Sequence, residues 1–99
     1  MKISNQKEGT QLVIALEGRL DTTSAPQLDE VVKAEIAGVE MLVMDFKALE
    51  YISSAGLRVL LSTQKVMNKQ GKMVIRNAND VVKEVFDMTG FSDILTLED

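Results

Sequence analysis

The segment that most constrains the fold of this chain is a short, almost wholly apolar run at residues 41–46, Met-Leu-Val-Met-Asp-Phe. Such a short run is more typical of a strand than of a buried helix. A strand that is apolar on both sides needs cover on both faces, as central strands of parallel sheets have. The run therefore predicts a central strand of an α/β sheet, and a similar run at 73–75 predicts another buried strand.

Two more strands are expected nearer the N-terminus. Apolar side chains recur at every second position from Leu12 to Leu16, which is the period of a strand. This strand is expected over 11–17, with Gly18 ending it. A turn at Gly9-Thr10 would connect it to a short first strand at 2–6.

The segments between these strands have helical spacing. The first helix is expected to begin at Ser24, because Ser24 can cap, Gln27 completes a capping box and Pro26 suits the first turn. A second helix is expected to open at Ser53 or Ser54 and to stop at Gly71 in the left-handed conformation. Apolar positions at helical spacing mark the buried stripes of these two helices: Leu28, Val31, Val32 and Ile36, then Leu57, Leu60, Leu61 and Met67.

A third helix is expected between a cap at Asn79 and a stop at Gly90. Residues 94–97 fit either an edge strand or a final helical turn. The order ββαβαβα(β) predicts one domain over residues 1–99, an α/β fold with a mixed, mostly parallel sheet of four to five strands and helices packed against it.

The composition narrows the possible chemistry. The chain has no cysteine and no histidine, which excludes Cys/His zinc sites, cysteine nucleophiles and Ser-His-Asp triads. The net charge of −4 argues against nucleic acid, which needs clustered Lys and Arg. No metal and no cofactor is expected, and a protein is the better expected partner.

We also expect no membrane association. No apolar run reaches the ~20 residues of a membrane span. The first residues, Met-Lys-Ile-Ser-Asn-Gln-Lys, lack the apolar stretch of a signal peptide. A cytoplasmic protein is therefore expected.

The segment 47–56 leaves the expected central strand and opens a helix at a serine. Functional sites of α/β sheets gather beyond the carboxyl ends of the strands. A serine hydroxyl there can cap the helix, which is worth ~1 kcal/mol. A phosphate there would instead add about −1.5 to −2 charges at the positive end of the helix dipole. Gly56 would let another molecule approach the first turn.

Two motifs resemble the signature of the STAS family, specifically its bacterial anti-sigma factor antagonists. One is Asp45-Phe46, three residues, and then Glu50-Tyr51-Ile52-Ser53-Ser54-Ala55-Gly56-Leu57-Arg58-Val59-Leu60-Leu61. The other is Leu16-Glu17-Gly18-Arg19-Leu20-Asp21, followed by Thr22-Thr23-Ser24-Ala25 and Leu28. The likeness covers essentially all 99 residues.

This resemblance implies a STAS fold and a regulatory binding protein rather than an enzyme. In the family a serine after an aspartate and before Ser/Thr/Ala and Gly is phosphorylated. Aligned on Gly56, that serine is Ser54. Ser53 stands in the place of the usual aspartate, and it is the second choice because it puts a second hydroxyl next to that of Ser54. Lys47 stands where the family often has a small hydroxyl residue, and Arg58 replaces a frequent glycine. The implied partner-binding residues are Asp21, Thr22, Thr23, Ser53, Ser54, Ala55, Gly56 and Arg58.

The resemblance further implies transcription regulation by partner switching. The unphosphorylated antagonist would bind an anti-sigma factor that is also a serine kinase of the histidine-kinase-like ATPase type. Phosphorylation would release it, and a PP2C-type phosphatase would reset it.

Other interpretations remain open. A small-molecule-binding or scaffold STAS module would need a pocket near residues 19–24 and 51–56. A hydrolase using Ser54 has no histidine as base and would need a buried lysine. Asp45 at the end of a strand is similar to the phosphoacceptor of a receiver domain, but the acidic pair and lysine of a receiver are missing. Asp21 could simply stabilise its turn.

Overall fold

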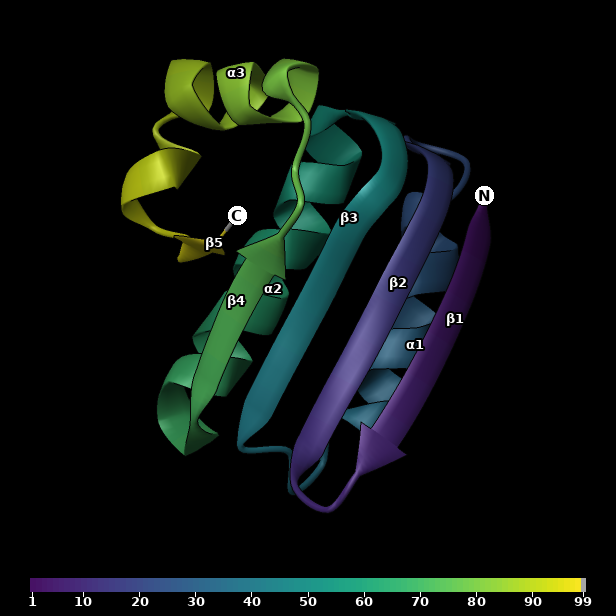
Figure 1. Ribbon diagram of the computed structural model, residues 1–99, viewed down its shortest axis with the longest axis vertical. Coiled ribbons are helices and arrows are strands. Elements are labelled where there is room, and N and C mark those ends of the chain that lie inside the picture. Colours follow the sequence, from purple (N-terminus) through teal and green to yellow (C-terminus); the bar gives the residue numbers. More distant parts are fainter. Residues whose placement is uncertain (99) are drawn as a thin grey trace.

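In a computed structural model of the protein, which describes residues 1–98, five strands form one sheet with the helices packed against it (Figure 1). The strands are β1 (Lys2–Glu8), β2 (Gln11–Leu20), β3 (Met41–Ile52), β4 (Lys72–Arg76) and β5 (Leu97–Glu98). The helices are α1 (Ala25–Glu35), α2 (Ser54–Gln70) and α3 (Asp80–Thr89), with a short 3₁₀ helix at Phe91–Asp93.

The strands lie in the sheet in chain order, β1-β2-β3-β4-β5. The β1–β2 pair is antiparallel, and the three other pairs are parallel. Parallel neighbours need a crossover connection, and α1 and α2 supply it for β2–β3 and β3–β4. The predicted α/β fold with a mixed, mostly parallel sheet is confirmed, and β3 is its central strand.

The core lies between the sheet and its helices. In Figure 1, α1 and α2 lie behind the sheet, and α3 lies across the end of β3. The largest fully buried side chains include Phe46 of β3 and Phe86 of α3. One cluster of buried apolar side chains joins the sheet to all three helices, and its members include Leu12, Ile14, Leu16, Leu28, Leu60 and Val82.

The other face of the sheet has no helix over it among residues 1–98 (Figure 1). Val13, Val43 and Val74 are register partners on β2, β3 and β4, so they form a straight row across this face. Val43 is only 2% exposed and Val74 4%, although neither belongs to the core cluster. The prediction that the central strand is buried on both sides is confirmed, but no helix buries this second side.

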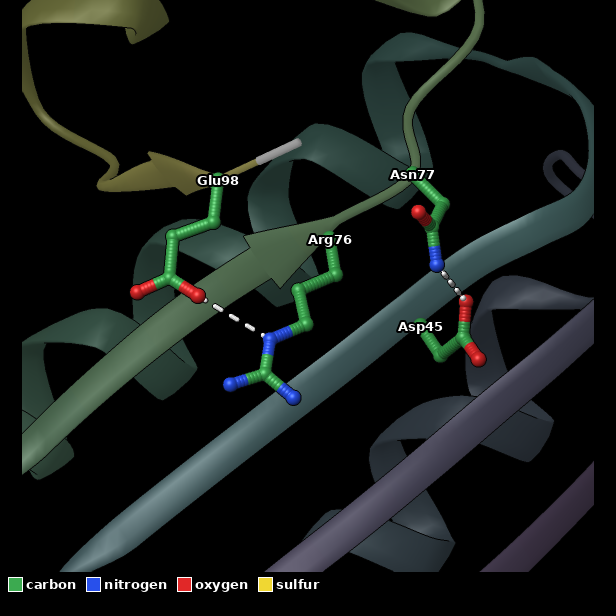
Figure 2. Close-up of polar contacts among 4 residues, drawn as sticks. All are labelled: Asp45, Arg76, Asn77 and Glu98. Carbon is green, nitrogen blue, oxygen red and sulfur yellow. Dashed lines mark hydrogen bonds and ion pairs between the residues drawn. The ribbon is translucent and has the colours of Figure 1, made fainter.

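A polar row lies next to the valines. Its members Asp45, Arg76 and Glu98 are register partners on β3, β4 and β5. Figure 2 shows the Arg76 guanidinium turned to Glu98, with Nε 3.0 Å from the carboxylate, and the Asn77 amide turned to Asp45. Arg76 and Glu98 have long side chains, and the stems of such side chains can cover neighbouring apolar surface.

The strands are longer than expected, most of all β3, and the ends of β2 and β3 matter for the site. The predicted ends at Gly18 and at residue 46 are wrong, since β2 runs to Leu20 and β3 to Ile52. The ladder between them shifts register after Ala15 and after Gly18. Such irregularities interrupt the regular alternation from which strands are recognised, so the pattern of residues 47–52 indicated a loop.

The helix stop that was predicted to be left-handed has a different conformation. Gly71 has a φ of 174°, so the predicted left-handed conformation is wrong. Glycine is needed at this position for a different reason: a Cβ would lie 1.9 Å from the carbonyl oxygen of Glu40. Gly90 ends α3 as expected, and the structure shows it in the left-handed conformation with a φ of 80°. The undecided segment 94–97 follows the 3₁₀ helix and leads into β5.

Candidate functional site

The candidate site lies where β2 and β3 end. Leu20 and Ile52 are partners in the parallel ladder, and the Ser53 N–H extends it by donating to the Leu20 carbonyl at 2.8 Å. The loop after β2 and the first turn of α2 are therefore held side by side. This places the Asp21 loop next to the two serines, although some thirty residues separate them in the sequence.

The two serines have different environments. Ser54 is the first residue of α2 and is exposed. Ser53 precedes the helix, and its hydroxyl oxygen is buried with no hydrogen-bond partner among the described residues. Ser53 occupies the N-cap position without making a side-chain cap hydrogen bond. The prediction that Ser53 caps the helix with its side chain is therefore wrong. Of the two serines, only Ser54 is an exposed residue.

Gly56 is buried in the first turn of α2. A Cβ at this position would lie 2.7 Å from Leu20 Cγ and 2.9 Å from Ile52 Cγ1. The missing side chain thus admits the protein's own strands β2 and β3, where the sequence suggested the approach of another molecule. Gly56 sets how closely α2 sits on the sheet.

The Asp21 carboxylate organises the loop between β2 and α1. Its Oδ1 accepts the backbone N–H groups of Thr23 at 3.0 Å and Ser24 at 3.1 Å. The Ser24 N–H lowers the pKa of Asp21 most, and the Ser24 hydroxyl, the Thr23 N–H and the Arg19 charge lower it further. The alternative role of Asp21, stabilising its turn, is confirmed, and its role in partner binding stays a prediction.

Ser24 serves this loop instead of capping α1. Its hydroxyl accepts the Asp21 N–H at 2.9 Å. Its one proton lies between two acceptors, the Arg19 carbonyl at 2.7 Å and Asp21 Oδ1 at 3.2 Å. No side-chain cap hydrogen bond forms at α1, so the predicted capping box with Gln27 is wrong. A hydroxyl that points to the Arg19 carbonyl at the end of β2 cannot also reach the backbone N–H groups of the first turn of α1. Asn79, by contrast, caps α3 as expected by accepting the Val82 N–H at 2.8 Å.

One contact of the site has no counterpart among the sequence predictions. The Arg19 guanidinium lies over the Tyr51 ring, with Cζ 4.7 Å from the ring centroid. Such a cation–π contact is worth ~0.5–1 kcal/mol at an exposed site. Arg19 is the partner of Tyr51 in the β2–β3 ladder. The pair could have been predicted only from the register that the two strands adopt after the irregularities near Gly18.

Five of the predicted partner-binding residues line two different hollows. A groove of about 310 Å³ between α1 and α2 is lined by Thr22, Ala55 and Arg58, together with Ala25, Pro26, Asp29, Val59 and Ser62. A second hollow of about 470 Å³ is lined by Asp21 and Thr23, together with Met1, Gly18, Arg19, Ser24, Gln27 and Glu50. The structure therefore divides these five predicted residues between two hollows, and Ser53, Ser54 and Gly56 line neither of them.

Asp45 lies away from this site. It is half-buried within β3 instead of ending a strand. Its Oδ1 accepts the Lys47 N–H at 3.0 Å. The same oxygen accepts the Asn77 amide, also at 3.0 Å (Figure 2). Within residues 1–98, no group of three or more acidic side chains is placed to hold a metal ion.

Comparison with known proteins agrees with this geometry. The sequence model of the STAS domain matches residues 2–99. BtrV of Bordetella bronchiseptica is 36% identical over 96 residues, which cover 95% of this chain and 83% of BtrV. The anti-sigma F factor antagonist of Paenibacillus polymyxa is 31% identical over 93 residues, covering 89% of this chain and 78% of that protein.

Solved structures show the same fold. The anti-sigma factor antagonist SpoIIAA in its unphosphorylated form superposes with a TM-score of 0.79 at 20% identity, covering 99% of this chain and 88% of that chain. The phosphorylated form of SpoIIAA from Bacillus superposes with a TM-score of 0.77 at 19% identity, covering 99% and 92%.

Proposed function

Because this chain belongs to the STAS domain family and its relatives are anti-sigma factor antagonists, we propose that it regulates transcription by partner switching. In its unphosphorylated form it binds an anti-sigma factor that is also a serine kinase of the histidine-kinase-like ATPase type. Phosphorylation at Ser54 releases the antagonist from the anti-sigma factor. A PP2C-type phosphatase restores the binding form, and the cycle takes place in the cytoplasm.

The exposure of Ser54 carries this proposal. The kinase transfers the γ-phosphoryl group of ATP to the Ser54 hydroxyl oxygen, which gives up its proton, and ADP leaves. The phosphatase later adds water and releases inorganic phosphate. Ser54 offers its hydroxyl at the surface of the first helical turn, whereas that of Ser53 is buried. A phosphate at the start of a helix is also tolerated by the fold itself.

The role of the protein is binding, not catalysis. The surface that meets the kinase comprises the loop residues Asp21, Thr22 and Thr23 and the first turn of α2 with Arg58. A phosphate at the centre of this surface would have to lose water or face like charge when the partner docks. This free-energy cost arises only in the complex, because in the free antagonist the phosphate stays exposed to water.

The test is phosphorylation of matched variants. With the kinase and ATP, we expect mass spectrometry to find phosphate on Ser54 in the natural protein and in Ser53→Ala, and none in Ser54→Ala. Ser54→Ala should keep its affinity for the kinase, and Ser54→Asp should bind at least ~10-fold more weakly, which corresponds to about 1.4 kcal/mol. Phosphate on Ser53, or on neither serine, would contradict the proposal.

A small-molecule-binding or scaffold STAS module is the second candidate. The hollow beside Arg19, Asp21 and Glu50 is the observation that favours it, because it has the size of a small-ligand site and combines both charges. Mass spectrometry of the protein under native conditions would show a bound ligand as added mass.

None of the helices within residues 1–98 has the length and apolar character needed to cross a membrane.

A further inference from the structure

Arg58 stands between Ser54 and the groove formed by α1 and α2. Both residues belong to α2 and are four positions apart. A helix turns by about 100° per residue, so Arg58 lies one turn along the axis and about 40° around it from Ser54. The groove residues Ala55, Val59 and Ser62 lie on the opposite side of Arg58, so its side chain can reach either way.

Within residues 1–98, the Arg58 guanidinium has no competing partner. Arg58 is exposed and forms no ion pair with any of residues 1–98. The carboxylate across the groove, Asp29, already pairs with Lys33 at 2.8 Å. The first turn of α2 contains no acidic residue. The other arginine of the site, Arg19, is placed over Tyr51.

We infer that phosphorylation of Ser54 moves the Arg58 side chain. Its guanidinium pairs with the phosphate within the same helix and is thereby withdrawn from the groove. This inference rests on the proposed function, because it begins with a phosphate on Ser54. Side chains four apart on a helix are neighbours. The planar guanidinium matches phosphate oxygens with two parallel hydrogen bonds.

The pairing gives the switch a second effect beyond repulsion. In the unmodified protein Arg58 faces the groove and is available to a carboxylate of a docked partner. After modification its guanidinium is held by a group that carries about −1.5 to −2 charges. A partner thus meets a new anion and also loses a cation, without any movement of the fold.

The test uses protein with phosphoserine introduced at position 54 during translation, so it needs no kinase. A ³¹P NMR titration measures the second pKa of the phosphate. A nearby cation favours the dianion, so Arg58→Gln should raise this pKa by about 0.3 relative to the arginine protein. Lys65→Gln is the matched control, because it removes one exposed positive charge from α2 eleven residues from Ser54, and it should leave the pKa within about 0.1 of its value.

A second readout is the Arg58 Nε–H signal in a ¹H–¹⁵N spectrum, which should shift when phosphoserine replaces Ser54. An equal pKa in the arginine and glutamine proteins, an equal change in both variants, or an unmoved Arg58 signal would each overturn the inference. These results are independent of whether a kinase modifies Ser54. The inference can therefore fail while the proposed function stands, and the reverse is also possible.

Discussion

At the scale of single residues, Asp21 couples the shape of the candidate site to pH. Its folded-state pKa lies below the usual value of an aspartate because the Ser24 and Thr23 N–H groups and the Ser24 hydroxyl bind the charged form. The carboxylate therefore contributes stability above its unfolded pKa, and this contribution is lost as the pH falls through the lower folded pKa.

We expect Asp21→Asn to be less stable than the natural protein at pH 7 and the difference to shrink as the pH falls below about 4. Chemical denaturation at pH 7 and at pH 3 measures it. Ser24→Ala removes a hydroxyl that binds the same carboxylate, so it should reduce the pH dependence without abolishing it. A difference between Asp21→Asn and the natural protein that is constant across this range would contradict the assigned cause.

At the scale of elements, α2 depends on the absence of a side chain at Gly56. Alanine in place of glycine inside a helix usually stabilises by up to ~1 kcal/mol. Here the added Cβ would lie under 3.0 Å from side-chain carbons of Leu20 and Ile52, and overpacking costs ~1–3 kcal/mol. We expect the steric term to win and Gly56→Ala to lower the free energy of unfolding, measured by denaturant titration. Ser62→Ala, at an exposed position of α2, is the control and should change stability by less than ~0.5 kcal/mol; a loss of the same size there would refute the steric explanation.

The same elements show what the sequence can predict. Helices α1, α2 and α3 and the starts of the strands follow from apolar spacing, because burial enforces that spacing wherever a regular element meets the core. The ends of β2 and β3 did not follow, because the register shifts near Gly18 are a property of the strand pair and not of either strand. The orientations of the Ser24 and Ser53 hydroxyls were equally hidden, since each depends on atoms beyond its own helix. Ser54 could be named from its motif, whereas its contrast with the buried Ser53 required the fold.

At the scale of the whole molecule, the two faces of the sheet bury valines in different ways. Val82 of α3 is fully buried within the core cluster, while Val43 lies on the face without a helix and is 2% exposed. If flanking side chains alone shield Val43, a hydroxyl placed there can reach water after small movements of those chains. A hydroxyl at position 82 cannot, and an unpaired buried hydroxyl costs ~1–3 kcal/mol.

The matched substitutions Val43→Thr and Val82→Thr test this difference. Both keep a β-branched side chain of similar size, and valine and threonine have similar helix propensities. We expect Val82→Thr to lower the free energy of unfolding by ~1–3 kcal/mol and Val43→Thr by less than half as much. Urea denaturation at two protein concentrations measures both. Equal losses would mean that the valine row is as dry as the core, and a loss at Val43 that depends on concentration would mean that another chain covers this face.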